Sequence, residues 1–139
     1  MRRQLFVLVT GIGLLLGGRA AFAHHAFSAE FDANASVNLR GTVVKTEWIN
    51  PHAWIHVQVK KADGTSEVWM IEGGTPNTLM RRGITRDSLP VGTELVVTGY
   101  QAKDGSNRAN GRDLTYPDGR KLFLGSTGTG APADTPADK

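Results

Sequence analysis

Residues 47–56 have the sequence Glu47-Trp48-Ile49-Asn50-Pro51-His52-Ala53-Trp54-Ile55-His56, which holds two of the three tryptophans and two of the four histidines. Asn-Pro is a strong turn signal, and apolar and polar residues alternate after it. This stretch therefore predicts a turn and the start of a strand, and the segments on both sides extend that pattern.

Two strands are predicted to flank this turn. Residues 37–48 alternate over a long run that is interrupted at Gly41, where a glycine indicates a bulge or a bend. Residues 53–60 alternate cleanly, with Ile55 and Val57 on one face. Both segments are predicted strands of a small β-barrel.

The remaining elements follow along the chain. Asp63-Gly64 is a hairpin signal, and residues 66–71 predict a third strand with apolar residues on both faces. Thr75 suits a helix N-cap and Pro76 suits the first helical position, so a helix of about two turns is expected there. The later predicted strands are residues 93–100, 112–116 and 120–124.

Three strands, a short helix and two or three further strands form the element order of an OB-fold, a five-stranded Greek-key barrel. We therefore expect a mainly β protein, a small OB-fold-like barrel of five to six strands with one short helix between strands three and four. Another small β-barrel, or a split sheet with one helix, is the alternative. The barrel is expected to span residues 37–124, after an arm over residues 24–36 and before a disordered tail over residues 125–139.

The first 23 residues have the pattern of a cleaved secretory signal. Arg2 and Arg3 precede an apolar run, and Ala21-Phe22-Ala23 supplies the small residues of a cleavage site. The run is shorter than the about 20 residues that span a bilayer. We expect a periplasmic protein that begins at His24 and has no transmembrane segment, exported by the Sec route or, given the arginine pair, by the twin-arginine route.

Charge and cysteine content limit the classes of function. Removal of the signal takes Arg2, Arg3 and Arg19 from the 16 Lys and Arg, and the 13 that remain equal the 13 Asp and Glu. A domain with balanced charge lacks the field that attracts a phosphate backbone, so nucleic acid is not the expected partner. The chain has no cysteine, which excludes disulfides, a lipid-anchored cysteine and thiol chemistry.

Several short motifs together resemble one known family. In chain order they are His24-His25-Ala26-Phe27 after the signal, Gly41-Thr42-Val43-Val44, Trp48-Ile49-Asn50-Pro51-His52-Ala53-Trp54, Glu72-Gly73-Gly74-Thr75-Pro76-Asn77 with Leu79 and Arg81-Arg82-Gly83, and Lys103-Asp104-Gly105-Ser106-Asn107. This pattern covers nearly all of residues 24–124 and resembles a family of small exported bacterial proteins of unknown function. The resemblance implies export and a compact domain, and it implies no activity.

In an OB-fold, ligands contact the face of strands two and three, and the loops that join strands one to two and four to five. These loops correspond here to residues 49–52 and 101–111. The predicted ligand-binding residues are Trp48, Asn50, His52, Trp54, His56, Lys103, Asn107 and Arg108. Trp48 and Trp54 would form an aromatic platform for a flat ligand, or else would pack as part of the barrel.

The histidines suggest a second function, the binding of copper or zinc. An N-terminal His24 would chelate a metal through its amine and its imidazole, His25 would add a nitrogen, and His52 would complete the site if the arm folds back. His56 would lie about 13 Å from His52 along a strand, too far to share the ion. The alternative is that His24 and His25 lie in a disordered leader and that His52 hydrogen-bonds its turn.

No known catalytic motif supports an enzyme. Glu47 near His52 is a weak candidate for an acid–base pair. Glu72-Gly73-Gly74 is a candidate for an anion site formed by backbone N–H groups, although a plain strand-to-helix turn explains it as well. We expect a non-enzymatic exported binding module for a small ligand, with a metal-binding protein and a structural or interaction protein of the envelope as the alternatives.

Overall fold

The structure, a computed structural model, describes residues 27–125 and 131–132. The predicted signal, His24, His25 and most of the predicted tail lie outside the described residues. Among the described residues, a short helix over residues 27–30 comes first. The elements that follow are β1 (Phe31–Trp48), β2 (Ala53–Lys60), β3 (Ser66–Glu72), the helix α3 (Pro76–Arg81), the 3-10 turn η1 (Arg86–Ser88), β4 (Glu94–Ala102), β5 (Arg108–Thr115) and β6 (Lys121–Phe123).

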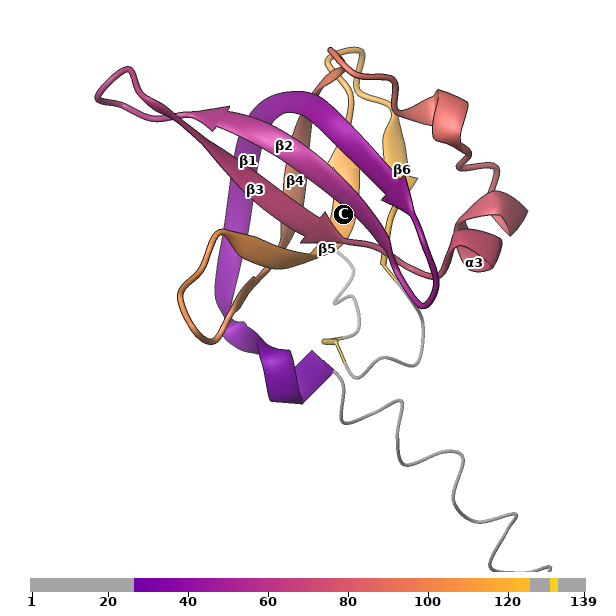
Figure 1. Cartoon of the computed structure of the whole chain (residues 1–139), viewed down its shortest axis with the longest axis horizontal. Coiled ribbons are helices and arrows are strands. Elements are labelled where there is room, and N and C mark those ends of the chain that lie inside the picture. The colour runs from indigo at the N-terminus through magenta and orange to yellow at the C-terminus, as the bar shows by residue number, and fades with distance from the viewer. Residues whose placement is uncertain (1–26, 126–130, 133–139) are drawn as a thin grey trace, which may run out of the picture.

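The six strands form one sheet that curls into a ring (Figure 1). The strand order is β3-β2-β1-β4-β5-β6 with antiparallel neighbours, and a parallel pairing between β3 and β5 closes the ring of five strands. The sixth strand, β6, adds to β5. The prediction of a mainly β barrel of five to six strands with one short helix between strands three and four is confirmed.

The long strand β1 pairs with β2 along one half and with β4 along the other. It begins at Phe31, earlier than the predicted start at residue 37, because Phe31 already pairs with β4. The bulge predicted at Gly41 lies instead between Val43 and Lys45. Gly41 is required for another reason: a Cβ at this position would lie 2.3 Å from the carbonyl oxygen of Gln58 in β2, so only a glycine allows this approach.

A continuous aliphatic core fills the barrel. Ile55 and Val57 of β2 are almost fully buried, as their alternation predicts. Burial of one such side chain stabilises the fold by about 1.5–3 kcal/mol. The core as a whole therefore allows the barrel to close without disulfides. The other core residues are Val43, Ala53, Trp69, Ile71, Leu79, Ile84, Leu89, Leu95, Val97, Ala109, Leu114 and Leu124.

The helix α3 starts where the sequence predicts. The Thr75 hydroxyl oxygen accepts a hydrogen bond from the backbone N–H of Thr78 at 3.1 Å, and Pro76 occupies the first turn, where a missing N–H costs nothing. Leu79 is fully buried, so the helix is held against the core by its side chain as well as by its cap.

The helix over residues 27–30 lies below one end of the barrel (Figure 1). The rings of Phe27 and Phe31 are 5.8 Å apart, and Phe27 also meets Tyr100 edge-on at 5.6 Å. These rings and Ala102 form a second, smaller apolar cluster. The turn between β1 and β2 and the loop between β4 and β5 lie at this same end (Figure 1), so the arm is anchored beside both predicted binding loops.

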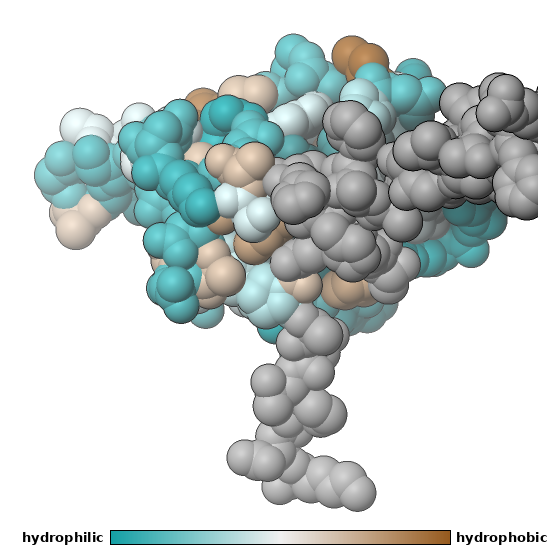
Figure 2. All heavy atoms as spheres, turned by 90° about the horizontal axis from the view of Figure 1, so that it is seen from below, coloured by the Kyte–Doolittle hydropathy of each residue, from teal (hydrophilic) through white to brown (hydrophobic). Residues whose placement is uncertain are grey.

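Seen from below, the described part is largely hydrophilic, and hydrophobic residues show as separate spots (Figure 2). Among the described residues, no helix has both the length and the apolar character needed to cross a bilayer.

Candidate functional site

Strand pairing places one row of side chains on the outside of the barrel. Trp54 of β2 lies opposite Glu47 of β1 and opposite Glu72 of β3, and Glu72 lies opposite Asn110 of β5. Residues that lie opposite each other in a sheet point to the same face. We call the following set the outer polar face: Glu47, Trp54, His56, Glu72, Arg108 and Asn110.

Glu72 is buried although it points away from the core, with 8% of the residue exposed. Its Oε1 atom accepts a hydrogen bond from Nδ2 of Asn110 at 3.2 Å and lies 3.8 Å from Nδ1 of His52. Burial raises the pKa of the Glu72 carboxyl group, and His52 and the Asn110 hydrogen bond oppose that rise. We call these three residues the buried polar cluster.

His52 connects the β1–β2 turn to the end of β3. Its Nδ1 atom is 3.1 Å from the carbonyl oxygen of Gly73, so this hydrogen bond exists in the tautomer or charge state in which Nδ1 carries a proton. The contact fixes the imidazole beside Glu72. His52 therefore belongs to the buried polar cluster, and its hydrogen bond to Gly73 also holds the β1–β2 turn beside the end of β3.

Glu47 and His56 form a separate pair on β1 and β2. Nε2 of His56 is 3.1 Å from Oε2 of Glu47, and Lys45 also pairs with Glu47. The hydrogen bond from Lys45, and then the one from His56, hold the pKa of Glu47 below its usual value. The acid–base pair considered between Glu47 and His52 is therefore not formed; each of the two has another partner.

Arg108 lies over the ring of Trp54. Its guanidinium carbon is 5.4 Å from the ring centroid, within the range of a cation–π contact. The same guanidinium forms an ion pair with Glu30 of the N-terminal helix, and the two side chains are 32% and 40% exposed. This contact joins the arm, β2 and β5 at one place on the outer polar face.

The other two predicted loop residues make structural contacts. The Lys103 ammonium group donates to the carbonyl oxygen of Ser28, and the backbone N–H of Lys103 donates to that of Glu30, so Lys103 holds the arm. The carbonyl oxygen of Asn107 accepts from the N–H of Met70 at 2.9 Å. The loop is also shorter than predicted, because β5 begins at Arg108.

The two tryptophans of the opening stretch lie on opposite faces of the sheet. Trp54 is on the outer polar face, whereas Trp48 lies opposite the buried Ala53 and packs against the core. The indole N–H of Trp48 is buried and has no hydrogen-bond partner among the described residues. Because the two rings lie on opposite faces, they do not form a common aromatic platform. Trp48 packs as part of the barrel, which was the alternative. Asn50 is exposed in the turn.

The backbone N–H groups after β3 are already used. Gly73 donates to the carbonyl oxygen of Ala53, and Gly74 donates to that of Leu124, each at 2.8 Å. These groups cannot form the anion site that the glycine pair suggested, and the segment is a strand-to-helix turn. Within this motif, Glu72 is the residue that belongs to the candidate site, as a member of the buried polar cluster.

The metal hypothesis depends on residues that the structure leaves out. His24 and His25 lie outside the described residues, so their distance from His52 is not defined. Within residues 27–125 and 131–132, no group of three or more His, Cys, Asp or Glu side chains is placed to hold a metal ion. Copper or zinc at His24, His25 and His52 stays a prediction.

Glu72 and Asn110 were not among the predicted site residues. A signal for Glu72 existed in the sequence, since it is an acidic residue that follows directly on the apolar third strand. Its partner could not be found in this way, because Asn110 reaches it only through the parallel pairing of β3 with β5. Together the site offers a buried acid, an imidazole, an amide and a guanidinium that lies over an indole ring.

Comparison with known proteins places the chain in one family. No curated protein and no solved structure matches it. A family model does match, over residues 13–111, a range that includes β1 to β4 and the whole outer polar face. The chain therefore belongs to the family of unknown function DUF6152.

Proposed function

We propose that the protein is a non-enzymatic binding module of the bacterial periplasm, and that its outer polar face holds a small organic anion. Arg108 pairs with the negative group of the ligand, and Trp54 lies against its apolar part. The single observation that carries this proposal is the position of the Arg108 guanidinium carbon over the Trp54 ring, 5.4 Å from its centroid, beside the hydrogen-bonded Glu72–Asn110 pair.

The ion pair between Arg108 and Glu30 supports an exchangeable anion site. A planar guanidinium binds carboxylates through paired N–H donors, and its position on an aromatic ring orients it in advance. Glu30 presents one such carboxylate from within the chain, and the pair is about one-third exposed. Exposed ion pairs contribute only about 0–1 kcal/mol, so a carboxylate of a ligand can replace Glu30 at small cost.

The neighbouring groups would select the rest of the ligand. The Trp54 ring is partly exposed and offers an apolar surface. The Asn110 amide donates to Glu72 and keeps its carbonyl oxygen as a further acceptor. A ligand with one carboxylate, a flat apolar body and a hydrogen-bond donor matches this order of groups.

Titration with benzoate tests the proposal, with benzamide as the neutral probe of the same shape. We expect benzoate to shift the NMR signals of the Trp54 indole and of Arg108, and benzamide to bind at least about tenfold more weakly, since loss of a charge-assisted hydrogen bond costs about 1.5–3 kcal/mol. Equal binding of the two probes, or benzoate shifts elsewhere on the barrel, would contradict the proposed site.

The chain provides a matched control for the arginine. Arg120 also lies over an aromatic ring, 4.6 Å from the centroid of Tyr116, and also pairs with a carboxylate, that of Asp118. Arg108→Gln should abolish the preference for benzoate, and Arg120→Gln should leave it unchanged. If both variants behave alike, Arg108 is not the anion-binding group.

Export is part of the same proposal. The Arg2-Arg3 pair, the apolar run and Ala21-Phe22-Ala23 support a cleaved signal. Intact mass of the protein recovered from the periplasm should correspond to a chain that begins at His24. Recovery of a chain that still carries residues 1–23, or its retention in the cytoplasm, would remove the periplasm from the proposal.

A further inference from the structure

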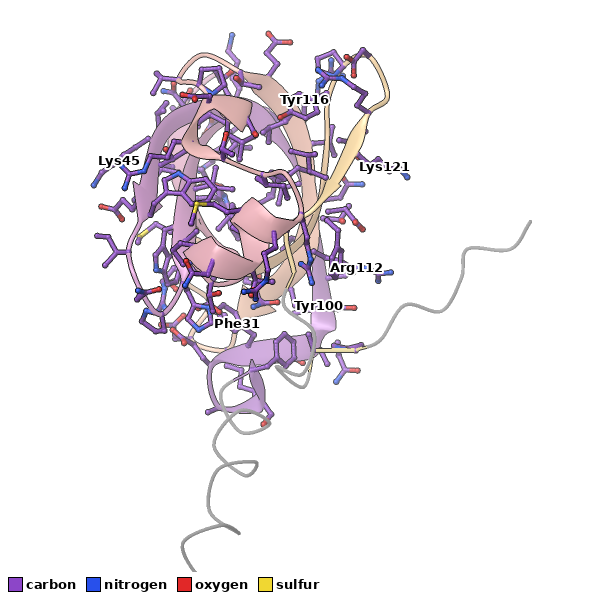
Figure 3. All side chains as sticks on the ribbon, turned by 90° about the vertical axis from the view of Figure 1, so that its right-hand side faces the viewer. Phe31, Lys45, Tyr100, Arg112, Tyr116 and Lys121 are labelled. Carbon is purple, nitrogen blue, oxygen red and sulfur yellow. The ribbon has the colours of Figure 1, made fainter. Side chains whose placement is uncertain are left out.

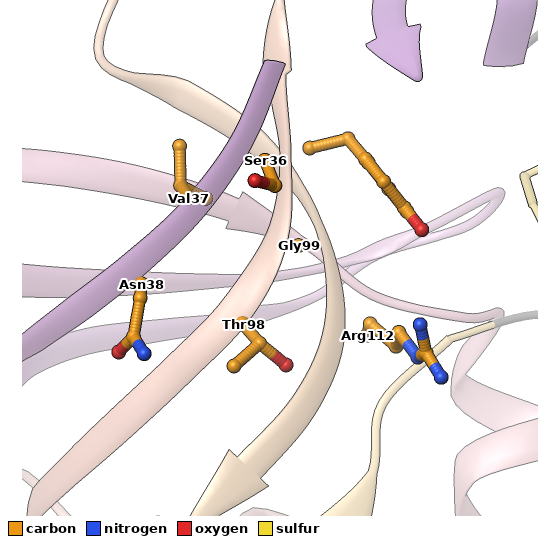
Figure 4. Close-up of a pocket in the computed structure, with 7 residues that line it drawn as sticks. Ser36, Val37, Asn38, Thr98, Gly99 and Arg112 are labelled. Carbon is orange, nitrogen blue, oxygen red and sulfur yellow. The ribbon is translucent and has the colours of Figure 1, made fainter. Parts of the chain in front are cut away.

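A hollow lies on the outside of the barrel, on β1, β4 and β5 (Figure 4). Two of the residues that line it, Tyr100 and Arg112, lie near each other in Figure 3. Its volume is about 290 Å³. Residues of all three strands line it: Ser36, Val37, Asn38, Thr98, Gly99, Tyr100 and Arg112. We call it the Gly99 hollow.

The floor of the hollow is a glycine that the fold requires. A Cβ on Gly99 would lie 2.1 Å from the carbonyl oxygen of Asn110, which is shorter than any real contact, so β4 and β5 can approach here only with a glycine. Gly99 contributes only backbone atoms to the lining of the hollow. The neighbours Thr98 and Tyr100, whose strand partners on β1 are Asn38 and Ser36, border the hollow.

A β-bulge brings Arg112 to the edge of the hollow. Thr98 pairs with Asp113, and Gly99 pairs with Gly111, so that Arg112 is the additional residue on β5. The backbone N–H of Leu124 donates to the carbonyl oxygen of Arg112 at 2.8 Å, which joins the bulge to the segment after β6. Bulges often re-aim a side chain next to a binding site. In Figure 4, Thr98 lies between Asn38 on one side and Arg112 on the other.

Four polar side chains of the hollow, those of Ser36, Asn38, Thr98 and Tyr100, are not hydrogen-bonded to one another. Within the described part of the chain, the hydroxyl groups of Ser36, Thr98 and Tyr100 and the amide of Asn38 make no side-chain hydrogen bond. Elsewhere on the barrel, hydroxyl groups such as those of Thr75 and Thr93 are hydrogen-bonded to nearby groups. Four groups that each can donate and accept therefore surround one small space.

The charge of the hollow is moderate. Nε of Arg112 is 3.5 Å from Oδ2 of Asp113, so a carboxylate accompanies the guanidinium. A hollow with three hydroxyl groups, an amide and one cation that is paired with a carboxylate favours a ligand with many hydroxyl groups over a strong anion. The aromatic ring of Tyr100 adds a surface for the C–H side of such a ligand.

We propose that the Gly99 hollow is a second ligand-binding site, distinct from the outer polar face, and that it takes a neutral saccharide. Vicinal hydroxyl groups match side chains that both donate and accept, and a volume of about 290 Å³ suits one small ligand. Ligand binding in the Gly99 hollow does not depend on the anion site at Arg108.

Titration with D-glucose tests this inference, with cyclohexanol as the ring of similar size that has a single hydroxyl group. Glucose should shift the backbone NMR signals of Asn38, Thr98 and Gly99, and cyclohexanol should leave them in place. Shifts with both probes, or no shift with glucose up to the highest soluble concentration, would overturn the inference.

Two isosteric substitutions localise the effect. Thr98→Val removes one hydroxyl group of the hollow and keeps a β-branched side chain, so glucose should bind about fivefold to tenfold more weakly. Thr42→Val is the control, since Thr42 is on the same outward face of β1 as Asn38 but outside the hollow. If Thr98→Val binds glucose as the native chain does, or if both variants lose affinity equally, the site is not the Gly99 hollow. Tyr100→Phe against Tyr116→Phe repeats the comparison if Thr98→Val is poorly folded.

Discussion

At the scale of single residues, Glu72 is the most unusual feature of the barrel. It is an acidic side chain on an outward-facing position, and yet it is almost fully covered. Its two polar partners come from the β1–β2 turn and from β5, so the cluster depends on three separate segments being in place. Such a group reports on the integrity of the site through its titration.

We expect the stability of the protein to depend on the ionisation of Glu72. Burial raises the pKa of this carboxyl group above its ordinary value of 4.5, so the folded state binds the proton more tightly than the unfolded chain does. The stabilising contribution is then complete below pH 4.5 and is lost as the pH rises through the raised pKa. Glu72→Gln cannot ionise, and its free energy of unfolding should rise relative to that of the native chain over this range.

Urea unfolding at a series of pH values measures this difference. Glu94→Gln is the control, since Glu94 is exposed at the start of β4. A difference between Glu72→Gln and the native chain that stays constant with pH would show that the carboxyl group is not perturbed by its burial.

Gly41 and Gly74 differ in whether the fold has room for a side chain at their positions. Gly41→Ala would place a Cβ 2.3 Å from the carbonyl oxygen of Gln58, so β1 and β2 must move apart. We expect a loss of about 1–3 kcal/mol in the free energy of unfolding, as for other overpacked positions. Gly74→Ala is the comparison, because its nearest contacts would be at 3.5 Å and ordinary. Thermal or urea unfolding of both variants should separate them clearly, and equal stability would refute the steric argument.

At the scale of elements, local signals were sufficient for much of the barrel. The alternation of residues 53–60 and the Asp63-Gly64 turn correctly predicted β2 and the hairpin, and Thr75-Pro76 correctly predicted the start of α3. These signals work because each is read within a few neighbouring residues. Alternation along residues 37–48 could not predict the face of Trp48, because the bulge between Val43 and Lys45 shifts the pattern by one residue. After the bulge Trp48 lies opposite the buried Ala53, whereas Trp54 points outward, so the sequence could not separate the two rings.

The N-terminal helix is an element held by few contacts, and this makes it testable. Phe27 anchors residues 27–30 through Phe31 and Tyr100, and the N–H of Lys103 donates to the carbonyl oxygen of Glu30 at 2.9 Å. Phe27→Ala should release the helix while the barrel stays folded, because local segments can open independently. Hydrogen exchange at the Lys103 amide should accelerate by at least about tenfold.

Ala29→Ser is the control for this experiment, since Ala29 is an exposed residue of the same helix. Its exchange rate at Lys103 should match that of the native chain. If Phe27→Ala also accelerates exchange throughout β2 and β3, the helix is part of the global fold and not a separate unit.

At the scale of the whole molecule, the sequence could predict the class of fold but not how the site is assembled. The outer polar face draws on β1, β2, β3 and β5, and the Gly99 hollow draws on β1, β4 and β5. Both depend on pairings between segments far apart in the chain. The bulge at Arg112 and the contact of Asn110 with Glu72 have no local signature, because each exists only once two strands have met.

The closure of the ring has a consequence for the kinetics of folding. Only three residue pairs join β3 to β5, Met70 to Glu72 with Arg108 to Asn110, and the segments they connect are distant in the chain. Bringing such distant segments together costs the most conformational entropy, and the contacts between them stabilise the chain only after the loop has closed. We expect the β3–β5 joint to form after the transition state, so that Asn110→Ala accelerates unfolding and leaves the refolding rate almost unchanged. Stopped-flow refolding and unfolding across a urea series will show it, and a slowed refolding arm would place the joint in the folding nucleus.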